Sequence, residues 1–262
     1  MSRLEVLFNK KSNRILNIYC TAGFPKLMDT IPVMQALQSS GADIIELGMP
    51  YSDPLADGEV IQSSSNIAIA NGMTVQELFK QLKNLRADQI SGGVGNELPV
   101  VLMGYMNTVL RYGFEAFCKD ASAVGIDGLI LPDMPAHEYE AKYKTVLEQY
   151  QLDLIFLVTP ETSENRVRYL DRLSSGFLYA VSSSSTTGNE KDFDAVTKYL
   201  QRLKSYQLKN KILVGFGIKD KTTFDAACAH ADGAIIGSVF IKKLNGAEDV
   251  LKTTQDFVSS VL

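Results

Sequence analysis

The sequence predicts an α/β fold, a single (β/α)8 barrel of the TIM type, and three observations lead to this prediction. The chain has 262 residues, a length that suits one closed barrel. Short apolar runs recur along it, and successive positions within a run are apolar, as is typical of parallel strands covered on both faces. Segments with helical periodicity separate these runs, so that strand and helix alternate. The eight runs span residues 15–20, 43–47, 100–103, 128–131, 153–158, 177–181, 211–214 and 233–236.

The segments between the runs carry signals of helix starts. Thr74 and Glu77 have the spacing of a capping box, in which each side chain bonds the backbone N–H of the other residue. Pro135 suits the first position of a helix, and Ser163 and Asp220 are residue types that commonly cap one. These signals support helices after the second, fourth, fifth and seventh strands.

Extra helices are expected beyond the repeating pattern. One precedes the first strand, over residues 3–9, and others follow the second and eighth strands. No proline- or serine-rich linker divides the chain, and residues 91–96 are typical of a loop, so we expect one domain over residues 1–262. An open, doubly wound sheet is the alternative, but eight strand–helix repeats with right-handed crossovers favour a closed barrel.

Composition excludes several classes of protein. The 26 basic and 30 acidic residues give a net charge of −4 without a basic stripe, which disfavours a nucleic-acid partner. No apolar run reaches the roughly 18–20 residues that span a membrane, and the first residues lack the apolar stretch of a signal peptide. Cys20, Cys118 and Cys228 have neither zinc-site nor disulfide-framework spacing. We therefore expect a cytoplasmic protein.

Carboxylates accompany the second strand, at the end of the barrel where catalytic residues gather. Glu46 lies inside an apolar run, although an ionised carboxylate is costly to bury without partners. Asp53 and Asp57 follow in a stiff segment that contains two prolines and a glycine. These residues are candidates for acid–base chemistry. A structural interpretation stays open, in which Glu46 forms a salt bridge inside the barrel and the aspartates bond nearby loop amides.

Glycines follow the seventh and eighth strands, where barrels of this type commonly bind phosphate. Residues 215–217 are Gly-Phe-Gly, and Gly237-Ser238 opens a short helical segment. Glycine lets a dianion approach the backbone, and the start of a helix offers unpaired N–H groups. The sequence therefore predicts a phosphate site here, to which Gly188 would add an amide from a polar, lid-like segment over 182–190.

No metal site is expected. His137 begins a helix and His230 ends one, and neither has a cluster of Asp, Glu or Cys around it. Cys20 ends the first strand without a basic neighbour that would activate its thiol, which favours a small buried residue.

One segment carries a specific resemblance to a known family. Residues 46–58, ELGMPYSDPLADG, resemble the signature segment of the tryptophan synthase α chain family. The similarity extends essentially from the leading helix to the last. Supporting matches are TAGFP over 21–25, YMN over 105–107, PDMP over 132–135 and the glycine loops after the seventh and eighth strands.

The resemblance implies a lyase of tryptophan biosynthesis that cleaves indole-3-glycerol phosphate to indole and glyceraldehyde 3-phosphate by a retro-aldol reaction. By position, Glu46 is the general acid that protonates indole C3, and Asp57 stabilises the indole N–H as positive charge develops. The residue types suit this division. Apolar surroundings keep a carboxylic acid protonated at neutral pH, whereas a more solvated loop aspartate stays ionised.

The resemblance also implies roles for residues around this pair. Tyr179, at the end of the sixth strand, and Thr187, in the lid, would contact the reacting region, and Thr187 would hold Asp57 when the lid closes. Phosphate would be bound by Gly188, Gly217, Gly237 and Ser238, and the indole pocket would be formed by Phe24, Ile130, Leu157 and Tyr105. For the first three of these pocket residues, ordinary packing in the barrel core is an equally good interpretation.

A protein partner is implied as well. The resemblance implies no cofactor in this chain, and a partner β chain that carries pyridoxal phosphate and consumes the indole within an α2β2 heterotetramer. Apolar residues in the loops over 105–107 and 132–135, on the active face, independently favour a protein partner there.

Two positions depart from the family pattern. Glu59 stands where the family usually has proline, and residues 185–188 are Ser-Thr-Thr-Gly where Gly-Val-Thr-Gly is common. The loss of glycine at Ser185 would stiffen the lid.

Two other functions remain to be separated from the lyase. A non-catalytic regulatory subunit that binds a sugar phosphate would not need both Glu46 and Asp57. A different phosphate-binding enzyme of the pathway, an isomerase or the indole-glycerol-phosphate synthase, is the other alternative. The synthase is expected to need a strand-borne lysine, and no lysine lies where the strand runs end at the active face.

Overall fold

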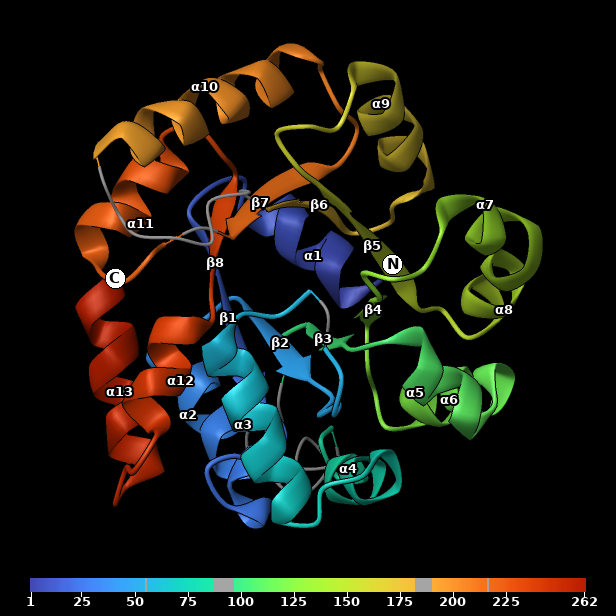
Figure 1. The fold of residues 1–262 in the computed structure, drawn as a ribbon, viewed down its shortest axis with the longest axis vertical. Helices are drawn as coiled ribbons and strands as arrows, with labels where there is room; N and C mark the ends of the chain where they lie inside the picture. The colour runs from blue at the N-terminus through green and yellow to red at the C-terminus, as the bar shows by residue number, and fades with distance from the viewer. Residues whose placement is uncertain (55, 87–96, 182–189, 216) are drawn as a thin grey trace.

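A computed structural model describes residues 1–54, 56–86, 97–181, 190–215 and 217–262 (Figure 1), except for the side chains of 190–193. Within these ranges no helix is both long enough and apolar enough to cross a membrane. The candidate loop at 91–96 lies outside the described residues.

The strands form a closed barrel in sequence order, and every neighbouring pair is parallel. The predicted (β/α)8 fold is confirmed, and each strand ends within one residue of its predicted bounds. Closure leaves no open sheet edge, so the alternative of a doubly wound sheet is wrong. The strands are β1 Ile15–Thr21, β2 Ile44–Gly48, β3 Val100–Met103, β4 Gly128–Ile130, β5 Asp153–Val158, β6 Phe177–Val181, β7 Lys211–Gly215 and β8 Gly233–Ile236.

The helices surround the strands as a ring, and α1 lies in the middle of that ring (Figure 1). The leading helix and the extra helices after β2 and β8 are present as predicted, and β3 and β4 are also followed by more than one helical segment. In order, the helices are α1 Arg3–Lys10, η1 Leu27–Asp29, α2 Thr30–Ser40, α3 Glu59–Ala70, α4 Val75–Leu82, α5 Met106–Tyr112, α6 Phe114–Ala123, α7 Ala136–Glu138, η3 Tyr139–Tyr143, α8 Lys144–Gln149, α9 Glu164–Leu173, α10 Glu190–Ser205, α11 Lys221–Cys228, α12 Ser238–Leu244 and α13 Val250–Val261.

The helix starts follow the predicted residues with some differences. Thr74 accepts a hydrogen bond from the backbone of Glu77, but Glu77 bonds Lys80 and Gln81 and does not return the bond. Asp220 caps α11 with its side chain, whereas Ser163 stands at the cap position of α9 without a side-chain bond. Pro135 precedes α7 as its cap residue and is not its first helical residue. The sequence therefore located these starts to within one residue but did not fix their hydrogen bonds.

The barrel interior holds a separate small core. Each described strand contributes one inward-facing residue to it, because alternate residues of a strand share a face. Leu4 of α1 packs beneath this layer, and the Phe8 ring meets Phe177 edge to face with centroids 6.4 Å apart. The helix α1 thus closes one end of the barrel. The inner layer consists of Ile15, Ile44, Val101, Ile130, Ile155, Phe177, Leu213 and Ile235.

Candidate active site

A cavity of about 250 Å³ lies above the inner core layer. Side chains two positions further along a strand share the face of the inner-layer residue but lie nearer the carboxyl end. From β2 this residue is Glu46, from β5 it is Leu157, and from β6 it is Tyr179. The cavity therefore occupies the carboxyl ends of the strands, where barrels of this type hold their active sites.

Glu46 is almost completely buried, with 1% of its surface exposed. The side-chain amide of Asn17 donates a hydrogen bond to its Oε2 at 3.0 Å. Burial raises the pKa of Glu46 to about 8, and nearby Asp57 adds to this rise, while the Asn17 hydrogen bond opposes it. In the described part of the chain no basic side chain pairs with Glu46, so the salt-bridge interpretation is wrong. A carboxyl group in this environment is protonated at neutral pH.

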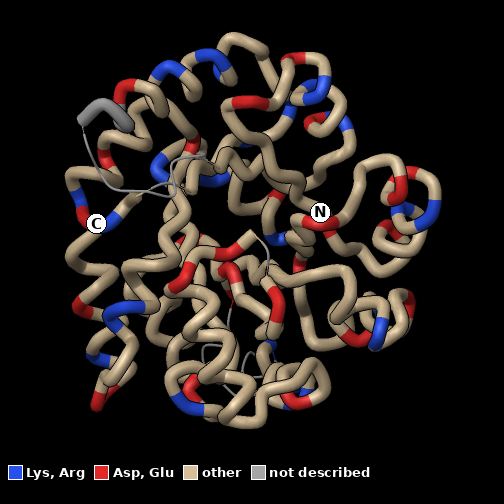
Figure 2. Tube along the Cα trace, viewed as in Figure 1, with Lys and Arg blue, Asp and Glu red and all other residues tan. Residues whose placement is uncertain are grey.

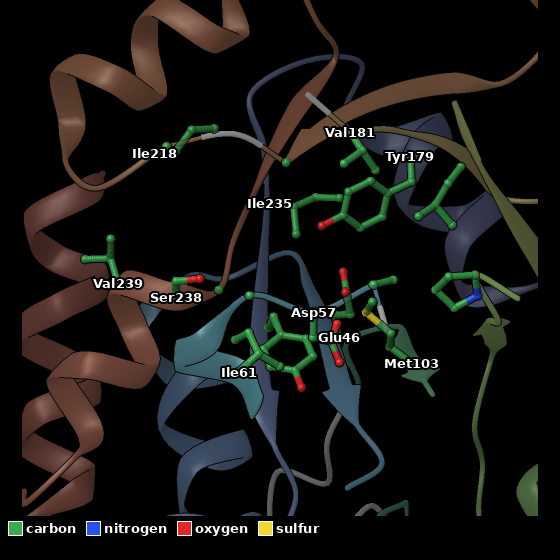
Figure 3. A pocket seen from close by; sticks show the side chains of 18 residues that line it. Glu46, Asp57, Ile61, Met103, Tyr179, Val181, Ile218, Ile235, Ser238 and Val239 are labelled. Atoms are coloured by element: carbon green, nitrogen blue, oxygen red, sulfur yellow. The ribbon is translucent and has the colours of Figure 1, made fainter. Parts of the chain in front are cut away.

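Asp57 enters the same cavity from the segment between β2 and α3, and Figure 3 shows it beside Glu46. It is partly buried, and burial raises its pKa to about 6, whereas a hydrogen bond from Tyr105 opposes the rise. The Tyr105 hydroxyl also accepts a hydrogen bond from the backbone N–H of Ala56 at 3.1 Å. Tyr105 therefore holds two successive residues, Ala56 and Asp57, in place. Two adjacent carboxyl groups therefore differ in protonation near neutral pH, as acid and charge-stabilising partners require.

Two tyrosines close the cavity, and glycines make room for their rings. Tyr179 projects across it in Figure 3, and a Cβ on Gly215 would lie 2.6 Å from the Tyr179 hydroxyl. A Cβ on Gly48 would lie 2.1 Å from the hydroxyl of Tyr19, which also lines the cavity. Both glycines are therefore required by the packing of the tyrosines.

The far side of the cavity is formed after β7 and β8. Gly217 has a φ of +48°, a left-handed conformation that favours glycine, and no atom lies within 4 Å of a Cβ built there. Gly237 precedes α12, and Ser238 begins that helix, on the opposite side of the cavity from Asp57 in Figure 3. No Lys or Arg occurs among the described lining residues. An anion held here would depend on backbone N–H groups and the Ser238 hydroxyl.

The predicted indole pocket is only partly where we expected it. Leu157 lines the cavity, but Phe24, Ile130 and Tyr105 are not among its lining residues. Ile130 belongs to the inner core layer one step lower, and Phe24 is buried beside a different cavity between α3 and α12. Tyr105 lies behind the segment that carries Asp57 and bonds it. For Ile130 the difference arises because strand residues two positions apart share a face but lie in successive layers, and it is Pro132, two positions on, that lines the cavity.

Other predicted residues lie outside the cavity or outside the described residues. Thr187 and Gly188, together with the departing residue Ser185, are not described, and most of the lid-like segment falls in the same gap. Asp53 is exposed, and its carboxylate accepts a hydrogen bond from the Ser52 hydroxyl at 2.5 Å, whereas the turn interpretation expected a bond from a backbone amide.

The loops over 105–107 and 132–135, which were expected to expose apolar side chains, bury most of them instead. Tyr105, Met106 and Met134 are all buried, so their apolar side chains serve the interior. The argument for a partner from exposed apolar loops is therefore wrong at these residues. Exposed apolar surface on that part of the barrel is found instead at Leu110, half of whose surface is accessible.

The described residues offer neither a metal site nor a reactive thiol at the cavity. The described residues contain no group of three or more His, Cys, Asp or Glu that could hold a metal ion. Cys20 is buried, and burial raises the pKa of its thiol to about 12, so it is inert as a nucleophile. Lys211 lies at the first residue of β7, the end opposite the cavity, where its ammonium group bonds Asp232 and the carbonyl of Ser12. Among the residues that the structure describes, no strand therefore carries a lysine to the active face, as the synthase would need.

Sequence reasoning missed several lining residues. Met103 and Pro132 lie two positions after the inner-layer residues Val101 and Ile130, and Tyr19 and Val181 lie four positions after Ile15 and Phe177, but finding them requires knowing which alternate set faces inward. Ile235 belongs to the inner layer itself, whereas Ile61, Ile218 and Val239 lie outside the strands, where strand periodicity gives no signal. Both sets are apolar here, because helices cover the outside of the barrel. The lining residues that the sequence did not indicate are Tyr19, Ile61, Met103, Pro132, Val181, Ile218, Ile235 and Val239, and Asn17 lies beneath them.

Comparison with known proteins identifies the family. The model of the family described as tryptophan synthase alpha chain matches residues 7–260. The chain belongs to the tryptophan synthase alpha chain family. It is 47% identical to the tryptophan synthase alpha chain of Flavobacterium johnsoniae over 253 residues, covering 96% of each chain. The corresponding chain of Parabacteroides distasonis is 45% identical, with 93% of each chain covered.

Solved structures agree with this assignment. The tryptophan synthase subunit alpha of Legionella pneumophila is 31% identical and superimposes with a TM-score of 0.89, covering 100% of this chain and 97% of that one. The aminoacrylate-bound tryptophan synthase of M. tuberculosis has a matching chain with a TM-score of 0.84 and 31% identity, with 100% and 98% covered.

Family membership establishes the activity. The tryptophan synthase alpha chain is a lyase that cleaves indole-3-glycerol phosphate in an aldolase-type half-reaction and supplies indole to the beta subunit. The family forms an α2β2 complex, and its pyridoxal phosphate resides in the beta subunit, whereas the alpha chain carries no cofactor. The recognition from the sequence is therefore confirmed.

Proposed function

We propose that Glu46 and Asp57 carry the cleavage of indole-3-glycerol phosphate in this chain, Glu46 as the general acid and Asp57 as the carboxylate that stabilises the indole N–H. The observation that supports this most strongly is that both carboxyl groups face one cavity with pKa values of about 8 and about 6. At pH 7 the first is mostly protonated and the second mostly ionised, as the two roles require.

The reaction balances with these two groups. Glu46 gives its proton to indole C3, and the ring nitrogen becomes positively charged while its N–H bonds the Asp57 carboxylate. The hydroxyl on the adjacent glycerol carbon then loses its proton to the Glu46 carboxylate, and the bond between that carbon and C3 breaks. Indole and the aldehyde of glyceraldehyde 3-phosphate result, and Glu46 is protonated again. Negative charge at Asp57 stabilises the cationic intermediate more strongly than the neutral substrate, which is how it accelerates the reaction.

The remaining site residues have proposed roles in binding. Gly217, Gly237 and Ser238 would hold the phosphate, joined by Gly188 from the segment outside the described residues. Tyr179 and Leu157 would enclose the reacting region, and Thr187 would contact Asp57 upon closure. Asp57 and Ser238 line opposite sides of the cavity (Figure 3), which supports this arrangement because the reacting carbon and the phosphate are separate parts of the substrate.

The pH dependence of kcat/KM tests the two protonation states, because it reports the pKa values of the enzyme before substrate binds. Activity needs ionised Asp57, so it is lost as the pH falls through about 6, and it needs protonated Glu46, so it is lost as the pH rises through about 8. We expect a bell-shaped profile with its maximum near pH 7, measured as indole release from the chain together with its beta partner. A profile that is flat from pH 5 to pH 9 contradicts both assignments.

Replacement at Gly237 tests the phosphate assignment. Gly237→Asp places a negative charge beside the proposed phosphate, and we expect the Kd for glyceraldehyde 3-phosphate to rise by at least about tenfold. Gly237→Ala is the matched control, because its Cβ would meet Tyr19 at an ordinary 3.4 Å and adds no charge. Titration calorimetry measures both. Kd values of both variants that equal the wild-type value would mean that the phosphate binds elsewhere.

An indole-release assay separates the lyase from the alternatives for this chain. Release from indole-3-glycerol phosphate by the pure chain, and faster release with the beta chain, supports the proposed roles. No release under either condition would leave a regulatory subunit that binds a sugar phosphate.

We also propose that residues 1–262 form one barrel domain, that this chain joins a beta chain as α2β2 and passes indole to it, and that it resides in the cytoplasm. The inner layer draws on every described strand, which supports one domain. Cys20, Cys118 and Cys228 are all free thiols, which suits a reducing compartment. In the view of Figure 2, Lys and Arg are interspersed with Asp and Glu on the outer helices, and carboxylates lie near the middle.

A further inference from the structure

Asn17 is a polar residue in an otherwise apolar part of the barrel. It lies on β1 between Ile15, which belongs to the inner core layer, and Tyr19, which lines the cavity. Its side chain is completely buried. Alternate residues of a strand share one face, so the amide stands between the core layer and the site above it. On the neighbouring strand β2, Asn17 is in register with Ile44, and Glu46 projects two residues further on, in register with Tyr19.

The hydrogen bonds of Asn17 do not suit a purely structural role. Its Nδ2 donates to Glu46 Oε2 at 3.0 Å, whereas its Oδ1 is buried and has no hydrogen-bond partner within the described residues. A buried amide with one unpaired end costs stability, and an apolar side chain of the same size would avoid that cost. By contrast, Asn210 at the other end of the barrel bonds Asp171 through both its backbone and its side chain. The amide of Asn17 therefore lowers the stability of the fold, and its one hydrogen bond, to Glu46, is the feature that can explain why it is retained.

The other groups around Glu46 do not replace this contact. None of them is a cation, so no attraction between opposite charges holds the carboxyl group in place among the described residues. The titratable groups that act on Glu46 or respond to it are Asp57 after β2, Tyr19 and Cys20 on β1, and Tyr179 on β6.

A hydrogen bond to one oxygen makes the two oxygens of a carboxyl group different. The Asn17 amide occupies Oε2, so the transferable proton of Glu46 is directed to Oε1. The bond also favours the ionised form of Glu46 and so lowers its pKa, whereas burial raises it. Glu46 can therefore release its proton as well as hold it. An acid without this bond would be oriented less well and would be weaker.

We propose that Asn17 is a positioning residue for the acid Glu46, retained inside the barrel for its hydrogen bond to Oε2 at the expense of stability. The inference rests on the proposed function, in which Glu46 protonates the substrate. It assigns to Asn17 no direct contact with the substrate.

Asn17→Leu tests the proposal, because leucine has a similar size and cannot donate. We expect kcat for indole release by the complex with the beta chain to fall by about 10- to 100-fold, with KM within about twofold. Removing the donor raises the pKa of Glu46, so the alkaline limb of the pH profile should move upward by about one unit. The variant should unfold at the same temperature as the wild type or a higher one.

Asn210→Leu is the matched control. It also removes a side-chain amide bonded to a carboxylate, but far from the cavity. We expect it to lower the unfolding temperature and to leave the alkaline limb in place. If Asn17→Leu also lowers the unfolding temperature without moving that limb, Asn17 is structural and the proposal is wrong. Should Asn17→Leu fail to fold, Asn17→Ser, whose shorter side chain cannot reach Oε2 directly, provides the same two measurements.

The pKa of Glu46 can be followed without activity. In a chain labelled with ¹³C at the glutamate carboxyl groups, the resonance that titrates near pH 8 and is missing from Glu46→Gln belongs to Glu46. We expect Asn17→Leu to move its titration upward, and an unchanged titration would overturn the inference. If Glu46→Gln remains fully active, the proposed function fails instead, and the NMR titration still decides whether Asn17 controls this carboxyl group.

Discussion

Replacing Glu46 with glutamine is expected to lower kcat for indole release by about 10²–10⁴-fold. Glutamine has nearly the same shape but no transferable carboxylic proton, so indole C3 would stay unprotonated and the carbon–carbon bond would not break. The phosphate end of the cavity is formed after β7 and β8, away from Glu46, so the Kd for glyceraldehyde 3-phosphate should change by less than about threefold. Steady-state kinetics and calorimetry measure the two effects separately.

The stability of this variant separates a catalytic from a structural role. The pKa of Glu46 is raised on folding from about 4.5 to about 8, so the folded state binds its proton more tightly than the unfolded state does. The free energy of unfolding of the wild type therefore falls as the pH rises from about 4.5 through about 8. Glutamine cannot ionise, so Glu46→Gln should be as stable as the wild type at pH 5 and more stable at pH 9. Loss of folding and ligand binding together with activity would instead show that Glu46 supports the fold.

The fold was predictable because its signals are repeated and local. Apolar runs such as 154–158 are bounded by polar residues, here Asp153 and Thr159. The alternation of strands and helices leaves few arrangements once eight repeats are present. Glu46 was predictable for a related reason: a carboxylate within an apolar run is costly to bury, so its presence there indicates a function. The signature segment that begins at this residue then identified the family.

The details of the site were less predictable because they depend on which face of each strand looks inward. Both faces of these strands are apolar, so hydrophobic patterning does not distinguish Ile130, in the core layer, from Leu157, in the cavity wall. Tyr105 was assigned to the indole pocket, but its hydroxyl bonds the segment that carries Asp57. Asn17 gave no signal in the sequence, because its proposed role comes from a hydrogen bond to Glu46 on the adjacent strand β2, 29 residues further along the chain.

Replacing Asp57 with asparagine is the second large effect that we expect, a reduction of kcat by about 10²–10³-fold. Asparagine preserves the size of the side chain, and its carbonyl oxygen can still accept the indole N–H. It lacks the negative charge that stabilises the cationic ring, and this charge matters most after C3 has been protonated. The loss should therefore appear in kcat, with KM changed only slightly.

The pH profile distinguishes this explanation from a general disturbance of the site. The acidic limb near pH 6 belongs to Asp57, so Asp57→Asn should abolish it and leave the alkaline limb of Glu46. That alkaline limb should also move to slightly lower pH, because Asp57 is one of the groups that raise the pKa of Glu46. Glu59→Gln is the matched control: Glu59 lies two residues away, exposed at the start of α3 and outside the cavity, and its replacement should leave kcat within about twofold. An acidic limb that persists in Asp57→Asn would assign the ionised group to another residue and remove Asp57 from the proposed mechanism.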